Sequence, residues 1–79
     1  MKQLTVMSRS GCHLCEQVIE ELVPLIRGRA HLEVVDIDTD PELVAQYGLR
    51  VPVVVGDERD LSEFPLDRDA VNGFLSVFD

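Results

Sequence analysis

The stretch that decides the fold is Ser8-Arg9-Ser10-Gly11-Cys12-His13-Leu14-Cys15. It joins an apolar run at residues 3–8, typical of a strand, to a helical pattern that begins at residue 12. Cys12 and Cys15 are the only cysteines of the chain, and in a helical turn such spacing brings Cβ atoms to about 5–6 Å. A modest adjustment reaches the roughly 3.5–4.5 Å that a disulfide needs. A disulfide between them would close a local loop and would hold no distant segments together.

Cys12 lies at or next to the N-cap of the helix expected over residues 12 to about 28. Free backbone N–H groups and the positive end of the helix dipole meet at this position, and both favour a thiolate. The thiolate is the attacking species in disulfide exchange. We therefore predict a thiol–disulfide oxidoreductase in which Cys12 is the nucleophile and Cys15, one turn into the helix, is the resolving thiol.

Two basic side chains lie close to this pair in the sequence. A protonated His13 would stabilise a Cys12 thiolate, whereas the alternative is an imidazole that points into solvent. Arg9 would bring positive charge to a thiolate or to an anionic substrate, the alternative being a solvated side chain in a polar loop. We interpret His13 as a modulating residue and Arg9 as a substrate-binding residue.

Other functions of a Cys-x-x-Cys pair fit the sequence less well. A closed zinc site needs four ligands, and only His13 and His31 could join the cysteines, so we expect no bound metal. Copper or zinc carrier domains also place such a pair between a first strand and a first helix. They carry Met where this chain has Ser10, and their β-α-β-β-α-β order differs. An interaction module whose cysteines do not turn over is the third alternative.

The rest of the chain predicts an α/β domain. Its patterns indicate strands at 31–38, 51–55 and 59–62, a short helix at 41–47, and a last helix that starts near Asp67. The order β-α-β-α-β-β-α gives a mixed four-stranded sheet covered by helices, in a single domain over residues 1–79.

Asp36, Asp38 and Asp40 superficially match a calcium loop, but Pro41 stands where its glycine belongs. We interpret these aspartates as strand-end and cap residues.

Further expectations concern single side chains. We expect Pro24 to kink the first helix or to end it early, and we expect His31 to lie on the surface. The residues predicted to face the core from the helices and the last loop are Leu14, Val18, Leu22, Leu25, Ile26, Leu43, Val44, Tyr47, Phe64, Val71, Phe74, Leu75 and Phe78.

The charge balance excludes several partners. Seven Lys and Arg stand against fifteen Asp and Glu, a net charge of −8 without a basic stripe, so duplex nucleic acid and an anionic membrane surface are not expected partners. No apolar stretch of about 18 residues and no signal-peptide pattern is present, so we expect a cytoplasmic monomer. Cytoplasmic thiols are kept reduced, which favours a redox or metal role for a close cysteine pair.

The segment at residues 8–15 resembles the active-site segment of glutaredoxins, where a Ser-Lys-Thr-type stretch precedes Cys-Pro-Tyr-Cys. Residues 47–52, Tyr-Gly-Leu-Arg-Val-Pro, are similar to the Tyr-Gly-x-x-Val-Pro of that family. The resemblance implies a short thioredoxin fold across nearly the whole chain. It also implies that Arg9 approaches the glycine carboxylate of glutathione, that Val51 pairs with a bound peptide or glutathione like an added strand, and that Pro52 is a cis-proline beside the disulfide.

The chain departs from the glutaredoxin pattern where that family holds the γ-glutamyl group of glutathione. Residues 61–67 lack the Gly-Gly pair, although backbone donors at a helix start near Asp67 would remain. The chain is acidic and glutathione is an anion, which disfavours a glutathione site. The expected substrates are protein disulfides or glutathione mixed disulfides. No bound cofactor is expected, and glutathione is one candidate reductant.

Overall fold

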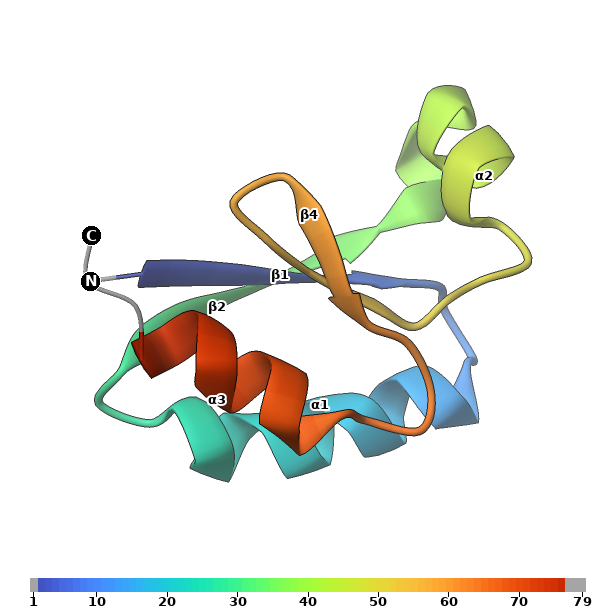
Figure 1. Ribbon diagram of the computed structural model, residues 1–79. Coiled ribbons are helices and arrows are strands. Elements are labelled where there is room, and N and C mark those ends of the chain that lie inside the picture. The colour runs from blue at the N-terminus through green and yellow to red at the C-terminus, as the bar shows by residue number, and fades with distance from the viewer. Residues whose placement is uncertain (1, 77–79) are drawn as a thin grey trace.

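A mixed four-stranded sheet forms the centre of the computed structural model, which describes residues 2–76 (Figure 1). The strands are β1 (Lys2–Ser8), β2 (Ala30–Asp36), β3 (Val53–Gly56) and β4 (Arg59–Ser62), in the spatial order β2-β1-β3-β4. β1 and β2 run parallel, whereas β3 is antiparallel to both β1 and β4. The predicted α/β architecture is confirmed. β2 ends earlier than expected because Ile37–Thr39 form a short 3₁₀ helix.

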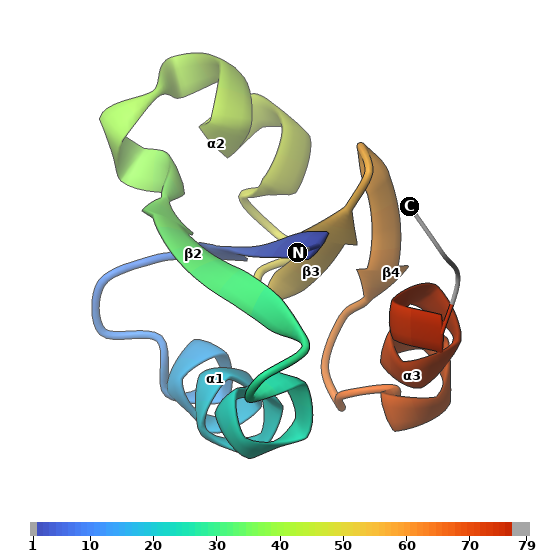
Figure 2. The ribbon, with the colours of Figure 1, turned by 90° about the vertical axis from the view of Figure 1, so that its left-hand side faces the viewer.

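Helices cover both faces of the sheet. α1 (His13–Ile26) and α3 (Arg68–Ser76) lie on one face, and α2 (Pro41–Tyr47) lies on the other (Figure 2). Alternation along the strands separates two cores. The core under α1 and α3 contains Leu4, Val6, Val18, Leu22, Ile26, Val54, Val71 and Phe74, and the core on the α2 side contains Ile37, Tyr47 and Val53.

The buried stripe of α1 begins at Cys15 and continues through Val18, Leu22 and Ile26. Leu14 was expected in this stripe, and that expectation is wrong: its side chain is 45% exposed. The helix turns Cys15 toward the sheet, and the adjacent Leu14 therefore faces outward. Pro24 lies in the last turn, and the helix ends two residues later. Gly28, in the turn that follows, adopts φ +76°, which a residue with a side chain rarely takes.

Two of the three aspartates are cap residues, as predicted: Asp40 caps α2, and Asp36 caps the short 3₁₀ helix that contains Asp38. Oδ1 of Asp40 accepts the backbone N–H of Glu42 at 2.9 Å, and Pro41 occupies the first turn. Oδ1 of Asp36 accepts the N–H of Asp38, also at 2.9 Å. These contacts fix the segment that links β2 to α2.

The outcome for the aromatic residues is mixed. Tyr47 and Phe74 are buried, as expected, and His31 is exposed. Phe64 is 38% exposed, so the expectation that it lies in the core is wrong. It lies in the connection between β4 and α3, where the chain has left the sheet. Phe78 lies outside the described residues. Within residues 2–76, no helix has both the length and the apolar character needed to cross a membrane.

Candidate functional site

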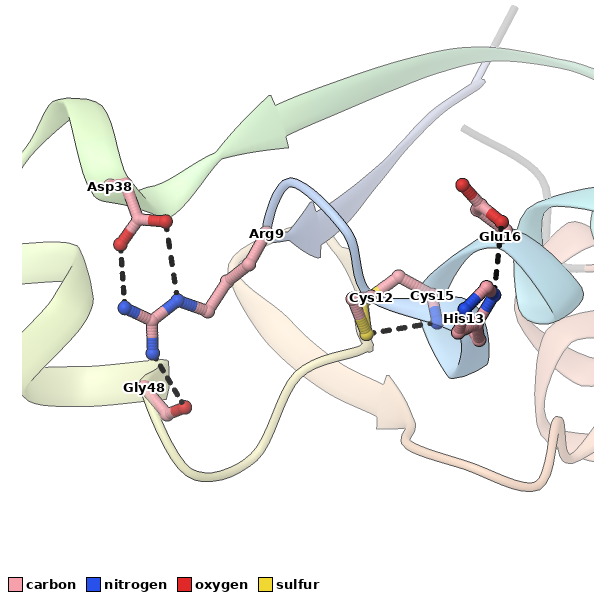
Figure 3. The surroundings of a disulfide bond; sticks show 7 residues. All are labelled: Arg9, Cys12, His13, Cys15, Glu16, Asp38 and Gly48. Atoms are coloured by element: carbon pink, nitrogen blue, oxygen red, sulfur yellow. Dashed lines mark hydrogen bonds and ion pairs between the residues drawn. A yellow bond between two sulfur atoms is a disulfide. The ribbon is translucent and has the colours of Figure 1, made fainter.

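Cys12 and Cys15 form a disulfide at the N-terminus of α1, with their Cα atoms 5.2 Å apart (Figure 3). Cys12 is the N-cap residue and has extended backbone angles, φ −87° and ψ 105°. Its Sγ accepts a hydrogen bond from the backbone N–H of Cys15 at 3.2 Å. The first turn of α1 therefore directs a backbone donor at the sulfur of Cys12, which is the role of an N-cap acceptor.

The two sulfurs differ in their access to solvent. Cys15 is 1% exposed and continues the buried stripe of α1, whereas Cys12 is half-buried at the end of the preceding loop. That loop turns at Gly11, which has φ +77°, and the N–H of Cys12 donates to the carbonyl oxygen of Arg9 at 3.3 Å. A reagent in solvent would therefore meet Cys12 before Cys15.

The loop that precedes β3 lies at the same end of the sheet as the start of α1, where the cysteines are (Figure 1). Met7 of β1 is paired with Val53 of β3 in antiparallel register, so the next residue backward, Pro52, falls opposite Ser8. The peptide bond between Val51 and Pro52 is cis, and Pro52 is buried. The fold thus brings together the two sequence motifs at residues 8–15 and 47–52.

Val51 is half-buried, and its backbone N–H is already engaged within the chain. Its N–H donates to the carbonyl oxygen of Tyr47 at 3.1 Å, at the C-terminal end of α2. An added strand would not receive this donor while that bond is intact.

Arg9 points away from Cys12 and toward Asp38 and Gly48 (Figure 3). Its Nη2 and Nε donate to the two carboxylate oxygens of Asp38, at 2.7 and 3.3 Å, and its Nη1 donates to the carbonyl oxygen of Gly48 at 3.3 Å. The hydrogen bond to Asp38 and the attraction of its charge raise the pKa of Arg9 above its usual range. Arg9 therefore connects the loop after β1 to the end of α2.

Arg50 makes a similar set of contacts on the other side of the 48–52 loop. Its Nη2 donates to carboxylate oxygens of Asp60 and Glu63, and its guanidinium lies 5.4 Å from the ring centre of Tyr47. The hydrogen bonds to these two carboxylates raise the pKa of Arg50. Arg50 is thus a cation that carboxylates of this chain already neutralise.

His13 lies at the surface, with a 95% exposed side chain. Its Nδ1 is 3.7 Å from Oε2 of Glu16, one turn further along α1. His13 directly follows Cys12 in the sequence, but in the structure its imidazole lies beside the carboxylate of Glu16.

The N-terminus of α3 is capped by the side chain of Asp67. Oδ1 of Asp67 accepts the N–H of Ala70 at 3.0 Å, and the N–H of Asp67 donates to Oγ of Ser62 at 2.8 Å. The donors expected near Asp67 are therefore present, but these two are already paired.

Sequence reasoning missed the link between Asp38 and the site. The pairing of β1 with β2 contained a signal for it, because Ser8 lies beside Asp36 in parallel register. Residues that follow the ends of parallel neighbouring strands emerge at the same edge of the sheet. Among the described residues, 2–76, no cluster of three or more His, Cys, Asp or Glu side chains is arranged to hold a metal ion.

A four-stranded β2-β1-β3-β4 sheet with a Cys-x-x-Cys pair at the start of α1 defines the thioredoxin-fold class of proteins. Within that class, the chain belongs to the glutaredoxin-like domain (DUF836) family, whose model matches residues 3–76.

Related proteins agree with this assignment. Protein Ne2328 from Nitrosomonas europaea is 37% identical, with a TM-score of 0.85 over 95% of this chain and 92% of its own. Protein XcR50 from X. campestris is also 37% identical, with a TM-score of 0.70 over 91% of this chain and 93% of its own. The uncharacterised protein Rv0508 of Mycobacterium tuberculosis is 33% identical over 72 residues, 82% of this chain and 73% of its own. Thioredoxin 1 from Thermosipho africanus, 17% identical, shares the fold with a TM-score of 0.62 over 92% of this chain and 93% of its own.

Proposed function

We propose that this protein is a thiol–disulfide oxidoreductase that uses Cys12 and Cys15 as a dithiol. The observation that carries the proposal is the position of Cys12: it is the N-cap of α1, it accepts the N–H of Cys15, and it is the more exposed sulfur of the disulfide. Helix N-termini and Cys-x-x-Cys pairs favour the thiolate, which is the attacking species.

The reaction proceeds by two exchanges. The thiolate of Cys12 attacks a substrate disulfide, which forms a mixed disulfide and releases one half of the substrate as a thiolate. The thiolate of Cys15 then attacks the Cys12 sulfur, releases the other half as a second thiolate and leaves the Cys12–Cys15 disulfide. An external dithiol or two molecules of a monothiol such as glutathione return the pair to its reduced form.

The alternative of a copper or zinc carrier is less consistent with this fold. A β-α-β-β-α-β order would be required, whereas here α2 separates β2 from β3 and the described chain ends in α3. Two thiolates alone can still bind a soft metal such as copper(I), so titration of the reduced protein with copper(I) is a useful comparison.

The experiment that tests the function compares two variants under anaerobic conditions. The reduced Cys15→Ser protein should accumulate a mixed disulfide with an added protein disulfide, visible by intact mass. Cys12→Ser should form none, because the buried Cys15 does not reach the substrate. Equal adduct formation by the two variants, or none by either, would contradict the proposal.

A further inference from the structure

Arg9, the arginine nearest the cysteine pair in the sequence, is already hydrogen-bonded to other groups of the protein. Nε and Nη2 of Arg9 form a two-pronged contact with the carboxylate of Asp38, and Nη1 donates to Gly48. All three nitrogens of the guanidinium are thus engaged. Bidentate, charge-assisted contacts of this kind are the stronger hydrogen bonds in proteins. An incoming carboxylate would have to displace Asp38 to use Arg9.

Other groups that an anion would use at this end of the sheet are engaged in the same way. Arg50 is held by Asp60 and Glu63. The start of α3 is capped by the carboxylate of Asp67. The chain also carries a net charge of −8, which opposes the approach of any anion.

Apolar side chains, in contrast, are presented beside the site. Leu14, between the two cysteines, is 45% exposed. Leu49 is fully exposed and directly follows Gly48, whose carbonyl oxygen accepts a hydrogen bond from Arg9. Exposed apolar side chains of this kind are suited to contact with a protein partner, but they provide no partner for the charged groups of glutathione.

We propose that Asp38 determines the substrate preference of the Cys12 site: by occupying Arg9 it disfavours anionic disulfides, and the site prefers uncharged or cationic disulfides, such as those flanked by basic residues in proteins. This inference rests on the proposed function, because it concerns the disulfide that Cys12 attacks. In that step a bond forms between Sγ of Cys12 and one sulfur, the original S–S bond breaks, and the other half leaves as a thiolate.

The test uses three small disulfides that differ in charge. Reduced Cys15→Ser protein is mixed at low ionic strength with cystamine, which is cationic, with 2-hydroxyethyl disulfide, which is uncharged, or with oxidised glutathione, which is anionic. Intact mass gives the rate of each adduct. We expect cystamine to react fastest and oxidised glutathione slowest. When Asp38→Ala is introduced into the Cys15→Ser protein, the ratio of the rate with oxidised glutathione to the rate with 2-hydroxyethyl disulfide should rise about threefold to fivefold. This is the change expected from the free energy of one exposed ion pair.

Two further variants separate the release of Arg9 from a change in net charge. Glu20→Ala removes one negative charge from an exposed position of α1 and should leave the relative rates unchanged. Arg9→Ala combined with Asp38→Ala should abolish the gain. High salt should reduce the gain as well, because it screens exposed charges. If Asp38→Ala does not fold, Asp38→Asn keeps the shape, removes the charge and should shift the ratio in the same direction.

The outcomes distinguish this inference from the proposed function. If 2-hydroxyethyl disulfide reacts but Asp38→Ala and Asp38→Asn leave the relative rate with oxidised glutathione unchanged, the role of Asp38 is overturned and the oxidoreductase function stands. The same follows if oxidised glutathione reacts fastest with the parent protein. If none of the three disulfides forms an adduct with Cys12, both are overturned.

Discussion

The backbone N–H of Cys15 lies 3.2 Å from Sγ of Cys12, so that the buried cysteine supplies a donor to the more exposed one. One residue thus contributes in two ways: its side chain starts the buried stripe of α1, and its backbone caps the sulfur at the helix start. The donor would also stabilise a thiolate at Cys12 in the reduced protein.

This asymmetry predicts unequal alkylation of the reduced protein. Iodoacetamide should modify Cys12 at least about tenfold faster than Cys15, with half of the maximal rate reached below about pH 8.5, the usual value for a free thiol. Because the pKa values of Arg9 and Arg50 are raised, both arginines keep their charge over this range and the pH profile reports on the thiol. Peptide mass spectrometry measures the two rates, and Cys12→Ser gives the rate of Cys15 alone. Equal and slow modification of both thiols would contradict an activated Cys12.

The position of His13 predicts a small effect on the reduction potential. A protonated imidazole would stabilise the Cys12 thiolate and hence the reduced form, but it is exposed and shares its charge with Glu16. His13→Ala should therefore lower the potential by less than about 20 mV. Glu16→Gln should raise it, because the competing carboxylate is removed. Equilibration with a glutathione redox buffer measures both. An unchanged potential in both variants would leave His13 as a solvent-facing side chain without a modulating role.

Much of the fold follows from local patterns. The polar loop between an apolar strand and an amphipathic helix predicts β1 and α1, and Asp40 followed by Pro41 predicts the start of α2, because caps depend on neighbouring residues only. The strand expected over 59–62 is found with the same bounds, as β4.

Features that depend on tertiary contacts were not predicted. Leu14 and Cys15 are adjacent and both apolar, and only the docking of α1 on the sheet decides that Cys15 is the buried one. Phe64 is a large apolar residue of the kind found in cores, but it lies in the connection between β4 and α3, where its side chain is exposed. The contact between Arg9 and Asp38 joins residues 29 positions apart and requires the register of β1 with β2.

The cap of α2 predicts a measurable contribution to stability. Asp40→Ala removes the acceptor for the N–H of Glu42 and should lower the free energy of unfolding by about 1 kcal/mol. Glu42→Ala, in the same exposed turn, removes a favourable charge near the helix start but no cap, and should cost about 0.3–0.5 kcal/mol. Urea unfolding followed by circular dichroism compares them. Equal losses would show that the carboxylate of Asp40 acts through charge alone.

Two glycines predict opposite effects of the same substitution. A Cβ atom at Gly56, the last residue of β3, would lie 2.8 Å from Cζ of Phe74 and 3.0 Å from Cδ1 of Leu61. Since Phe74 belongs to the core under α3, Gly56→Ala should lower the free energy of unfolding by about 1–3 kcal/mol. Gly73 lies within α3, and a Cβ there would meet no atom of the described residues within 4 Å.

Gly73→Ala should therefore raise the free energy of unfolding by about 0.5–1 kcal/mol, because alanine loses less conformational entropy in a helix. Urea unfolding of both variants gives the two signs directly. A gain in stability for Gly56→Ala would show that the ring of Phe74 has room to move away from β3. The contrast between the two glycines thus tests the packing of α3 against the sheet without altering either cysteine.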